Sequence, residues 1–156
     1  MMARDGIKVV ARNRKARHDY HIEETYEAGL VLKGTEIKSI REGRVSIRDG
    51  YVRPRDGELW LLDVHIGPYK PAGQYYGHDL RRPRKLLLHR YQIDRLIADV
   101  ERGGYTIIPL QMYLRDGRAK VEIALAKGKA KHDKRRAIAE RDAQREIERA
   151  MRDRRR

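Results

Sequence analysis

Few side chains in this sequence are spaced as catalytic or metal-binding groups would be. His18-Asp19-Tyr20-His21 places donor atoms at a spacing typical of metal ligands, but in a strand that begins here His18 and His21 would point to opposite faces. No nucleophile has a base in a recognisable arrangement. The sequence therefore predicts a protein that is not an enzyme and holds no metal or cofactor, with a metal-dependent nuclease as the enzymatic alternative. Three aspartates precede glycines, as is typical of turns: Asp49, Asp56 and Asp116.

Cations are the most abundant reactive groups, because the 156 residues include 37 Lys and Arg against 23 Asp and Glu, a net charge of +14. Such a chain attracts polyanions, and nucleic acid is the natural candidate. Membrane binding is not expected, since the basic C-terminal part lacks the Trp, Phe and Leu of surface-bound helices. The absence of cysteine excludes disulfides, thiol catalysis and cysteine-ligated metals. With no apolar run of signal-peptide or membrane-spanning length, we expect a cytoplasmic protein.

The cations concentrate from Lys127 onward, where 13 Lys and Arg stand against 6 Asp and Glu, a net of +7 in 30 residues. We expect residues 1–126 to form an RNA-binding body and 127–156 a basic tail, with Gly128 as a hinge. Isolated helices of this length are marginal in water. The tail is therefore predicted to be disordered when free and helical against a polyanionic surface. A helical tail would carry a narrow apolar stripe, mostly alanine: Ala139, Ala143, Ile147, Ala150 and Met151.

The body that positions these cations has mostly the pattern of strands. From Tyr20 to Leu32 the even positions are apolar, as in a half-buried strand, with Glu24 as the one exception. Residues 35–42 then show helical spacing and end at a glycine, which predicts a short helix.

Turn signals divide the rest of the body into two hairpins and a helix. We predict a hairpin over 51–62, an amphipathic helix through 93–100 and a closing hairpin over 105–126, in which Pro109 indicates an edge or a bulge. The connections are mostly too short for crossovers between parallel strands. We therefore predict a mainly β protein: a small barrel of the oligonucleotide-binding type with flanking short helices.

Two basic groups in the body favour RNA as the polyanion. One is Arg81-Arg82-Pro83-Arg84-Lys85, near the aromatic residues Tyr75 and Tyr76. The chain has no Phe and few stacking platforms, so recognition of a folded RNA by shape and phosphates is favoured over reading of single-stranded bases. A general single-strand RNA-binding module or ribosome-associated factor is the alternative. The other basic group is expected on strand faces: Arg12, Arg14, Lys15 and Arg17.

Five blocks of the sequence together resemble a known family. They are Ala16-Arg17-His18-Asp19-Tyr20, Tyr26-Glu27-Ala28-Gly29-Leu30, Gly34-Thr35-Glu36-Ile37-Lys38-Ser39, Arg84-Lys85-Leu86-Leu87-Leu88 and Gly128-Lys129-Ala130-Lys131-His132-Asp133-Lys134-Arg135. From about residue 7 to its end, the chain resembles the SsrA-binding protein family, also called small protein B. The resemblance implies an oligonucleotide-binding barrel that partners transfer-messenger RNA in rescuing bacterial ribosomes stalled on messages without a stop codon. It also implies a complex of the alanyl-charged RNA with elongation factor Tu, and we expect a monomer.

The resemblance implies an RNA-contacting surface on the body. Glu27, Leu87 and His89 match positions that contact the D-loop side of the tRNA-like domain of that RNA. His89 departs from the asparagine also found there, although both side chains donate and accept hydrogen bonds. By this likeness the barrel replaces the missing anticodon arm. Three more residues are expected on the RNA-binding surface: Arg17, His18 and Lys85.

The resemblance gives the tail a separate role, in the decoding centre and empty message channel of the ribosome. Cations there meet phosphates, and an imidazole can stack on a base. Ala143 and Ala150 stand where some relatives carry larger apolar residues, so the last turns are expected to depend more on arginine. The tail residues implied are Gly128, Lys129, Lys131, His132, Asp133, Lys134, Arg135 and Met151.

Overall fold

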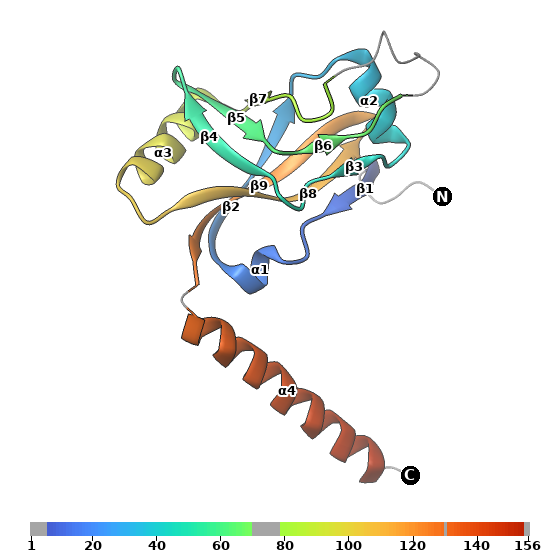
Figure 1. Ribbon diagram of the computed structural model, residues 1–156, viewed down its shortest axis with the longest axis vertical. Helices are drawn as coiled ribbons and strands as arrows, with labels where there is room; N and C mark the ends of the chain where they lie inside the picture. Colours follow the sequence, from blue (N-terminus) through green and yellow to red (C-terminus); the bar gives the residue numbers. More distant parts are fainter. Residues whose placement is uncertain (1–5, 70–78, 130, 155–156) are drawn as a thin grey trace.

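The computed structural model describes residues 6–69, 79–129 and 131–154, with side chains in the last helix described for residues 141–152 (Figure 1). The strands are β1 (Ile7–Arg12), β2 (Tyr20–Leu30), β3 (Val45–Ser46), β4 (Tyr51–Arg55), β5 (Glu58–Leu62), β6 (His65–Ile66), β7 (Arg84–Leu87), β8 (Thr106–Arg115) and β9 (Arg118–Gly128). The helices are α1 (Ala16–Asp19), α2 (Gly34–Arg41), α3 (Arg90–Glu101) and α4 (Lys131–Arg154). The prediction of a mainly β fold with helices is confirmed.

Seven strands form one antiparallel sheet in the order β1-β8-β4-β5-β7-β2-β9, and β9 also pairs with β8. This last pairing joins six strands into a closed ring, while β1 pairs with β8 outside the ring. The sheet therefore curls around one core, with α3 packed against it through Ile93 and Leu96 (Figure 1). Fully buried side chains from facing strands fill the core, among them Leu61, Leu86 and Met112.

β2 confirms the strand predicted from Tyr20, and the structure explains its polar exception. The register of β2 on β9 shifts between Ile22 and Glu24, which marks a bulge. Beyond the bulge, the Glu24 carboxylate accepts a hydrogen bond from the Tyr26 hydroxyl and forms an ion pair with Arg95 of α3 at 2.8 Å. A charged residue is therefore accommodated at position 24, because Arg95 of α3 supplies its ion-pair partner.

The remaining periodic segments also fold as predicted. The helix expected over 35–42 is α2, the amphipathic helix is α3, and the closing hairpin is formed by β8 and β9. Asp116 and Gly117 in its turn have φ angles of 50° and 80°, the left-handed region that an Asp-Gly pair tolerates. The register of β8 on β9 shifts between Pro109 and Gln111, which confirms the bulge predicted at Pro109.

The cations from Arg12 to Arg17 do not share a strand, so that expectation is wrong. β1 ends at Arg12, Arg14 and Lys15 lie in a turn, and Arg17 belongs to α1. In α1 the backbone N–H of Asp19 donates to the Lys15 carbonyl at 2.9 Å, which closes a single helical turn. A helix of four residues is too short to show a period in the sequence.

A buried ion network joins α2 to β7. Glu36 and Arg84 are both fully buried and form an ion pair at 2.7 Å between Nε and Oε2. Arg84 also donates to the carbonyls of Val64 and Leu80, and Arg82 forms a second ion pair with Glu36. The guanidinium groups are thus held inward by one carboxylate and by backbone carbonyls.

This network corrects the prediction of an exposed basic patch over residues 81–85. Arg84 is buried, Arg82 is half-buried and engaged with Glu36, and Lys85 is half-buried, which leaves Arg81 as the exposed cation of the group. The sequence pattern could not show this, because the neutralising carboxylate comes from a distant helix. Tyr75 and Tyr76, the aromatic residues expected beside the patch, lie outside the described residues.

Acidification is expected to destabilise the protein partly through Glu36. Burial alone raises the pKa of Glu36, but hydrogen bonds from the Lys33 N–H, Arg82 and Arg84 outweigh burial and lower this pKa below its ordinary value. A carboxyl group with a lowered folded-state pKa stabilises the fold above its unfolded pKa of about 4.3, and this stabilisation is lost as pH falls through the folded pKa. Urea unfolding from about pH 7 down to pH 3 should show a falling free energy of unfolding.

The same titration of Glu36→Gln isolates the contribution of this carboxyl group. The variant should be less stable at neutral pH and should lose less free energy of unfolding on acidification. Parallel curves for the two proteins would contradict the assignment.

Candidate nucleic-acid interface

β2 and β7 bring together the three body residues that the resemblance implies. Gly29 and Leu87 are cross-strand partners, so Glu27 on β2 lies beside the end of β7. A Cβ on Gly29 would stand 3.3 Å from the Leu87 Cβ, so glycine permits this close approach. The ends of these two strands border a pocket of about 350 Å³, which we call the Glu27 pocket. Its lining residues are Glu27, Gly29, Leu87, Leu88, His89, Gln92 and Lys120.

The carboxylate of Glu27 is oriented by two neighbours on β8. The Tyr113 hydroxyl donates a hydrogen bond to Glu27 Oε2, and Arg115 Nη2 lies 3.0 Å from the same oxygen. Burial and the bond to Glu27 raise the pKa of Tyr113, so its hydroxyl keeps its proton and remains a donor. Glu27 remains partly open to solvent, with 37% of its side chain exposed. It therefore presents a fixed negative acceptor at the mouth of the pocket.

An apolar and aromatic edge borders the pocket. Leu87 is 50% exposed and Tyr91 is 71% exposed, both high values for large hydrophobic residues. The rings of His89 and Tyr91 stack with centroids 5.6 Å apart and planes 12° apart. The Gln92 side chain accepts a hydrogen bond from the His89 backbone N–H at 3.1 Å, which fixes the start of α3. This edge offers a flat surface on which a base can stack.

Two features of this surface were not predicted from the sequence. Lys120 reaches the pocket because β9 pairs with β2, placing Lys120 opposite Gly29. Tyr91 lies outside the apolar stripe of α3 that contains Ile93 and Leu96. This position in the helical period is the one feature of the sequence that indicates an outward-facing side chain. Both depend on strand register or helix phase, so neither could be assigned to the pocket before the fold was known.

The other predicted body residues lie elsewhere. Lys85 is half-buried on β7, with Trp60 of β5 as its cross-strand partner. Arg17 and His18 belong to α1, where His18 Nδ1 lies 2.9 Å from Asp19 Oδ1. Within the described residues, no group of three or more His, Asp or Glu side chains could hold a metal ion. Arg17, His18 and Lys85 do not line the Glu27 pocket, and their contact with RNA stays a prediction.

The start of the tail is bound to the barrel. β9 runs to Gly128, which pairs with Tyr20, so the sheet extends past the predicted end of the body at residue 126. The backbone N–H of Lys129 donates to the Asp19 carbonyl at 2.9 Å, and Lys129 Nζ donates to the Arg17 carbonyl at 3.0 Å. Gly128 is therefore a paired strand residue rather than the hinge expected there.

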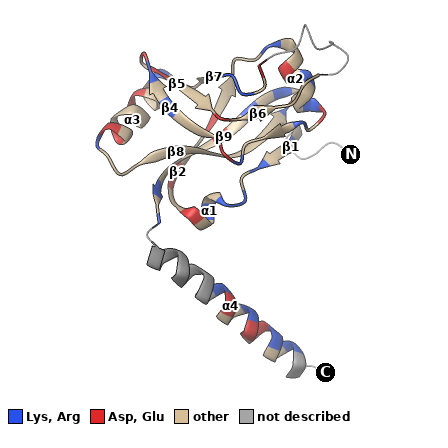
Figure 2. Ribbon diagram, in the orientation of Figure 1, with Lys and Arg blue, Asp and Glu red and all other residues tan. Residues whose placement is uncertain are grey.

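Beyond this junction α4 extends away from the barrel as a single helix (Figure 1). Blue and red segments alternate along its described part, so basic and acidic side chains are interspersed (Figure 2). Ile147 and Met151 are 50% and 56% exposed, so the narrow apolar stripe has a free surface at these two positions. Disorder of the free tail stays a prediction. The side chains of Lys131, His132, Asp133, Lys134 and Arg135 lie outside the described residues.

Comparison with known proteins assigns the chain to a family. The family model described as SmpB protein matches residues 10–153. The chain belongs to the SmpB family. Over nearly its full length, the chain is also similar to proteins named SsrA-binding protein. One from Roseiflexus sp. (strain RS-1) is 63% identical over 147 residues, which cover 94% of this chain and 93% of the relative. One from Nostoc punctiforme is 56% identical over 147 residues, with 94% and 95% covered.

A solved structure supports the SmpB assignment. It is described as "tmRNA-SmpB: a journey to the center of the bacterial ribosome", and one of its chains is similar to this one with a TM-score of 0.65 and 48% identity. The likeness covers 81% of this chain and 92% of that one. Within the part of this SmpB-family chain that the structure describes, no helix has both the length and the apolar character of a membrane span.

Proposed function

We propose that this protein binds the tRNA-like domain of transfer-messenger RNA and delivers that RNA to stalled ribosomes in the cytoplasm. The observation that carries the proposal is the Glu27 pocket, where Glu27, Leu87 and His89 meet from segments far apart in the sequence. Membership of the SmpB family and similarity to proteins named SsrA-binding protein support it.

Binding at the Glu27 pocket combines one fixed acceptor with apolar and aromatic contacts. The Glu27 carboxylate accepts hydrogen bonds from base or ribose donors, because Tyr113 and Arg115 hold it in place. Leu87 offers exposed apolar surface, and His89 offers a ring that can donate, accept or stack. Lys120 supplies a cation for a nearby phosphate. None of these roles makes or breaks a covalent bond, so the proposed activity is binding and not catalysis.

The tail has the second role in this proposal, in the decoding centre and message channel. Gly128 pairs with Tyr20 of β2 and Lys129 donates to carbonyls of α1, so the start of the tail is held at the barrel, and the segment from Lys131 to Arg135 lies just beyond it in the sequence. Exposed Met151 would contact the channel further along α4. The partners proposed are therefore the transfer-messenger RNA, the small-subunit RNA of the ribosome and, with the charged RNA, elongation factor Tu. The protein would act as a monomer.

Replacing Glu27 by alanine is expected to weaken the complex with the tRNA-like domain about tenfold to a hundredfold. A hydrogen bond to a charged group contributes about 1.5–3 kcal/mol, and each 1.4 kcal/mol is about tenfold in affinity. The fold should survive, because Glu27 lies on the outer face of β2 and is partly exposed. Electrophoretic mobility shift with the isolated tRNA-like domain measures the loss, and thermal unfolding checks the fold.

Glu23→Ala is the matched control, since Glu23 is an exposed glutamate on the same strand. It should leave the affinity nearly unchanged. Tyr113→Phe removes the donor that orients Glu27 but keeps the carboxylate, so it should cause a smaller loss than Glu27→Ala. If Glu27→Ala instead lowered the unfolding temperature as a core substitution does, Glu27 would be a structural residue.

A general single-strand RNA-binding factor is the second candidate, and a competition experiment separates the two. Labelled tRNA-like domain bound to the protein is challenged with an unstructured RNA of equal length. Equal competition by both RNAs would favour the general factor. Selective displacement by unlabelled tRNA-like domain would support the proposed function.

A further inference from the structure

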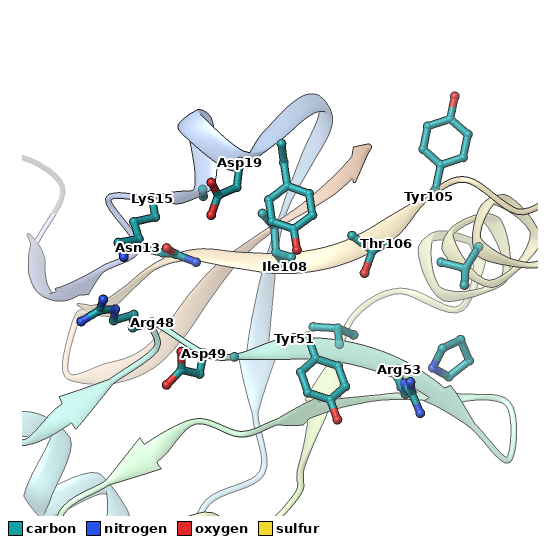
Figure 3. Close-up of a pocket in the computed structure, with 16 residues that line it drawn as sticks. Asn13, Lys15, Asp19, Arg48, Asp49, Tyr51, Arg53, Tyr105, Thr106 and Ile108 are labelled. Atoms are coloured by element: carbon teal, nitrogen blue, oxygen red, sulfur yellow. The ribbon is translucent and has the colours of Figure 1, made fainter. Parts of the chain in front are cut away.

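A cavity of about 690 Å³ lies between β4, β8 and the turn that leads into α1 (Figure 3). It forms where β4 and β8 diverge, since their described pairing is limited to Val52 and Ile107. Asn13 lines the cavity, and its Nδ2 donates to the Pro109 carbonyl of β8 at 3.1 Å. We call this cavity the Tyr51 pocket. None of its described lining residues belongs to the Glu27 pocket.

Three tyrosines line the Tyr51 pocket, Tyr20, Tyr51 and Tyr105, and all are half-buried. Tyr51 and Arg53 both line the pocket from β4, and Figure 3 shows their side chains next to each other. The Arg53 guanidinium lies 5.5 Å from the centroid of the Tyr51 ring, at cation–π distance. The pocket therefore contains the stacking surfaces that the composition of the chain did not predict.

Charged groups gather at the other end of the pocket. Figure 3 places Lys15 and Arg48 there, with the carboxylates of Asp19 and Asp49 lying between these cations and Tyr51. Two carboxylates weaken the attraction for a bare phosphate ion. The Asp49 carboxylate can, however, accept hydrogen bonds from the N–H groups of a base, whereas Asp19 Oδ1 already lies 2.9 Å from His18 Nδ1. The arrangement suits a ligand that carries a planar ring, N–H donors and an anionic group together.

We propose that the Tyr51 pocket binds a single unpaired nucleotide of an RNA, with its base against Tyr51 and its phosphate at Lys15 and Arg48. Aromatic rings beside cations are how proteins hold single-stranded nucleotides. The volume falls in the range of about 300–1,000 Å³ usual for small-ligand sites. An acidic peptide fits less well, because its carboxylates would meet Asp19 and Asp49 and it need not offer a planar ring.

The position of the pocket indicates which RNA supplies the nucleotide. Tyr20 pairs with Gly128, and the Lys127 ammonium lies 5.3 Å from the Tyr105 ring centroid, so the pocket adjoins the start of the tail. The nucleotide would therefore come from the RNA that surrounds the tail and not from the RNA bound at the Glu27 pocket. This last step rests on the proposed function, whereas nucleotide binding itself does not.

The test uses the full chain and a single-stranded hexanucleotide, oligo(A) with one 2-aminopurine, whose fluorescence falls when the base stacks. Tyr51→Ala should weaken hexanucleotide binding about tenfold or more, because stacking is lost, while Tyr51→Phe should bind as the parent does. Arg48→Ala should weaken binding about threefold through loss of one phosphate contact. Arg48 is exposed, so this variant tests the pocket even where Tyr51→Ala disturbs the fold.

Glu23→Ala is the control, since this exposed glutamate lines neither pocket, and it should leave hexanucleotide binding unchanged. Unchanged binding in both Tyr51→Ala and Arg48→Ala would overturn the inference, as would an equal loss in Glu23→Ala. The proposed function has a separate readout, because it fails if Glu27→Ala leaves affinity for the tRNA-like domain intact.

Discussion

A chain that ends after Lys129 is expected to keep its affinity for the tRNA-like domain and to lose peptide tagging on stalled ribosomes. The Glu27 pocket is formed by β2, β7, α3 and β9, all of which such a chain retains. Such a chain also retains all of β9, whose pairing with β2 and β8 closes the barrel, so the fold should survive. Tagging in a reconstituted translation system with a message lacking a stop codon measures the loss.

A full-length variant separates the helical form of the tail from its charge. Ala143→Pro breaks an exposed helix interior at a cost of about 3 kcal/mol, without changing any charge. Ala143→Ser is the matched control, since serine is tolerated in a helix. Loss of tagging in the proline variant alone would show that α4 must be helical on the ribosome. A truncated chain that tags normally would refute the assignment of the tail.

Arg84→Met is expected to lower the free energy of unfolding by about 3–5 kcal/mol, the usual effect of removing one partner of a buried ion pair. The reason is that Glu36 would remain fully buried with Arg82 as its remaining ion-pair partner, and the carbonyls of Val64 and Leu80 would lose their donor. Chemical denaturation measures the change.

Two further variants make this expectation specific. Arg81→Met alters an exposed arginine three positions away and should change stability little. Replacing both Glu36 and Arg84 by methionine should recover much of the loss, because no buried charge is then left unpaired. If Arg84→Met proved no worse than Arg81→Met, the buried network would not be a main source of stability.

Local patterns predicted the elements whose period is long enough to read. The apolar residues of β2 and α3 each recur with a clear period, and Asp116-Gly117 is a turn signal that predicts the hairpin of β8 and β9. α1 escaped prediction because a single turn has no period. The exposure of Arg84 was predicted wrongly, since a local rule treats arginine as a surface residue while its partner Glu36 lies far away in the sequence.

The candidate site could be predicted only in part, for a similar physical reason. Glu27, Leu87 and His89 were implied by resemblance and not by spacing, and the pairing of β2 with β7 is what brings them together. Lys120 and Tyr91 complete the surface through strand register and helix phase. The three tyrosines of the Tyr51 pocket come from β2, from β4 and from the residue just before β8, so composition alone suggested few stacking platforms.

The hydrogen bonds of Lys129 have a kinetic consequence. Sheet pairing and these bonds fix the chain as far as Lys129, and α4 begins at Lys131, so one residue separates the fixed part from the helix. Two binding surfaces on one chain act together, because binding at the first makes binding at the second intramolecular. In the proposed function, binding of RNA at the Glu27 pocket would therefore bring the tail to the ribosome without a separate encounter. Entry of the helix into a channel would then depend on how the barrel is seated more than on the helix's own affinity.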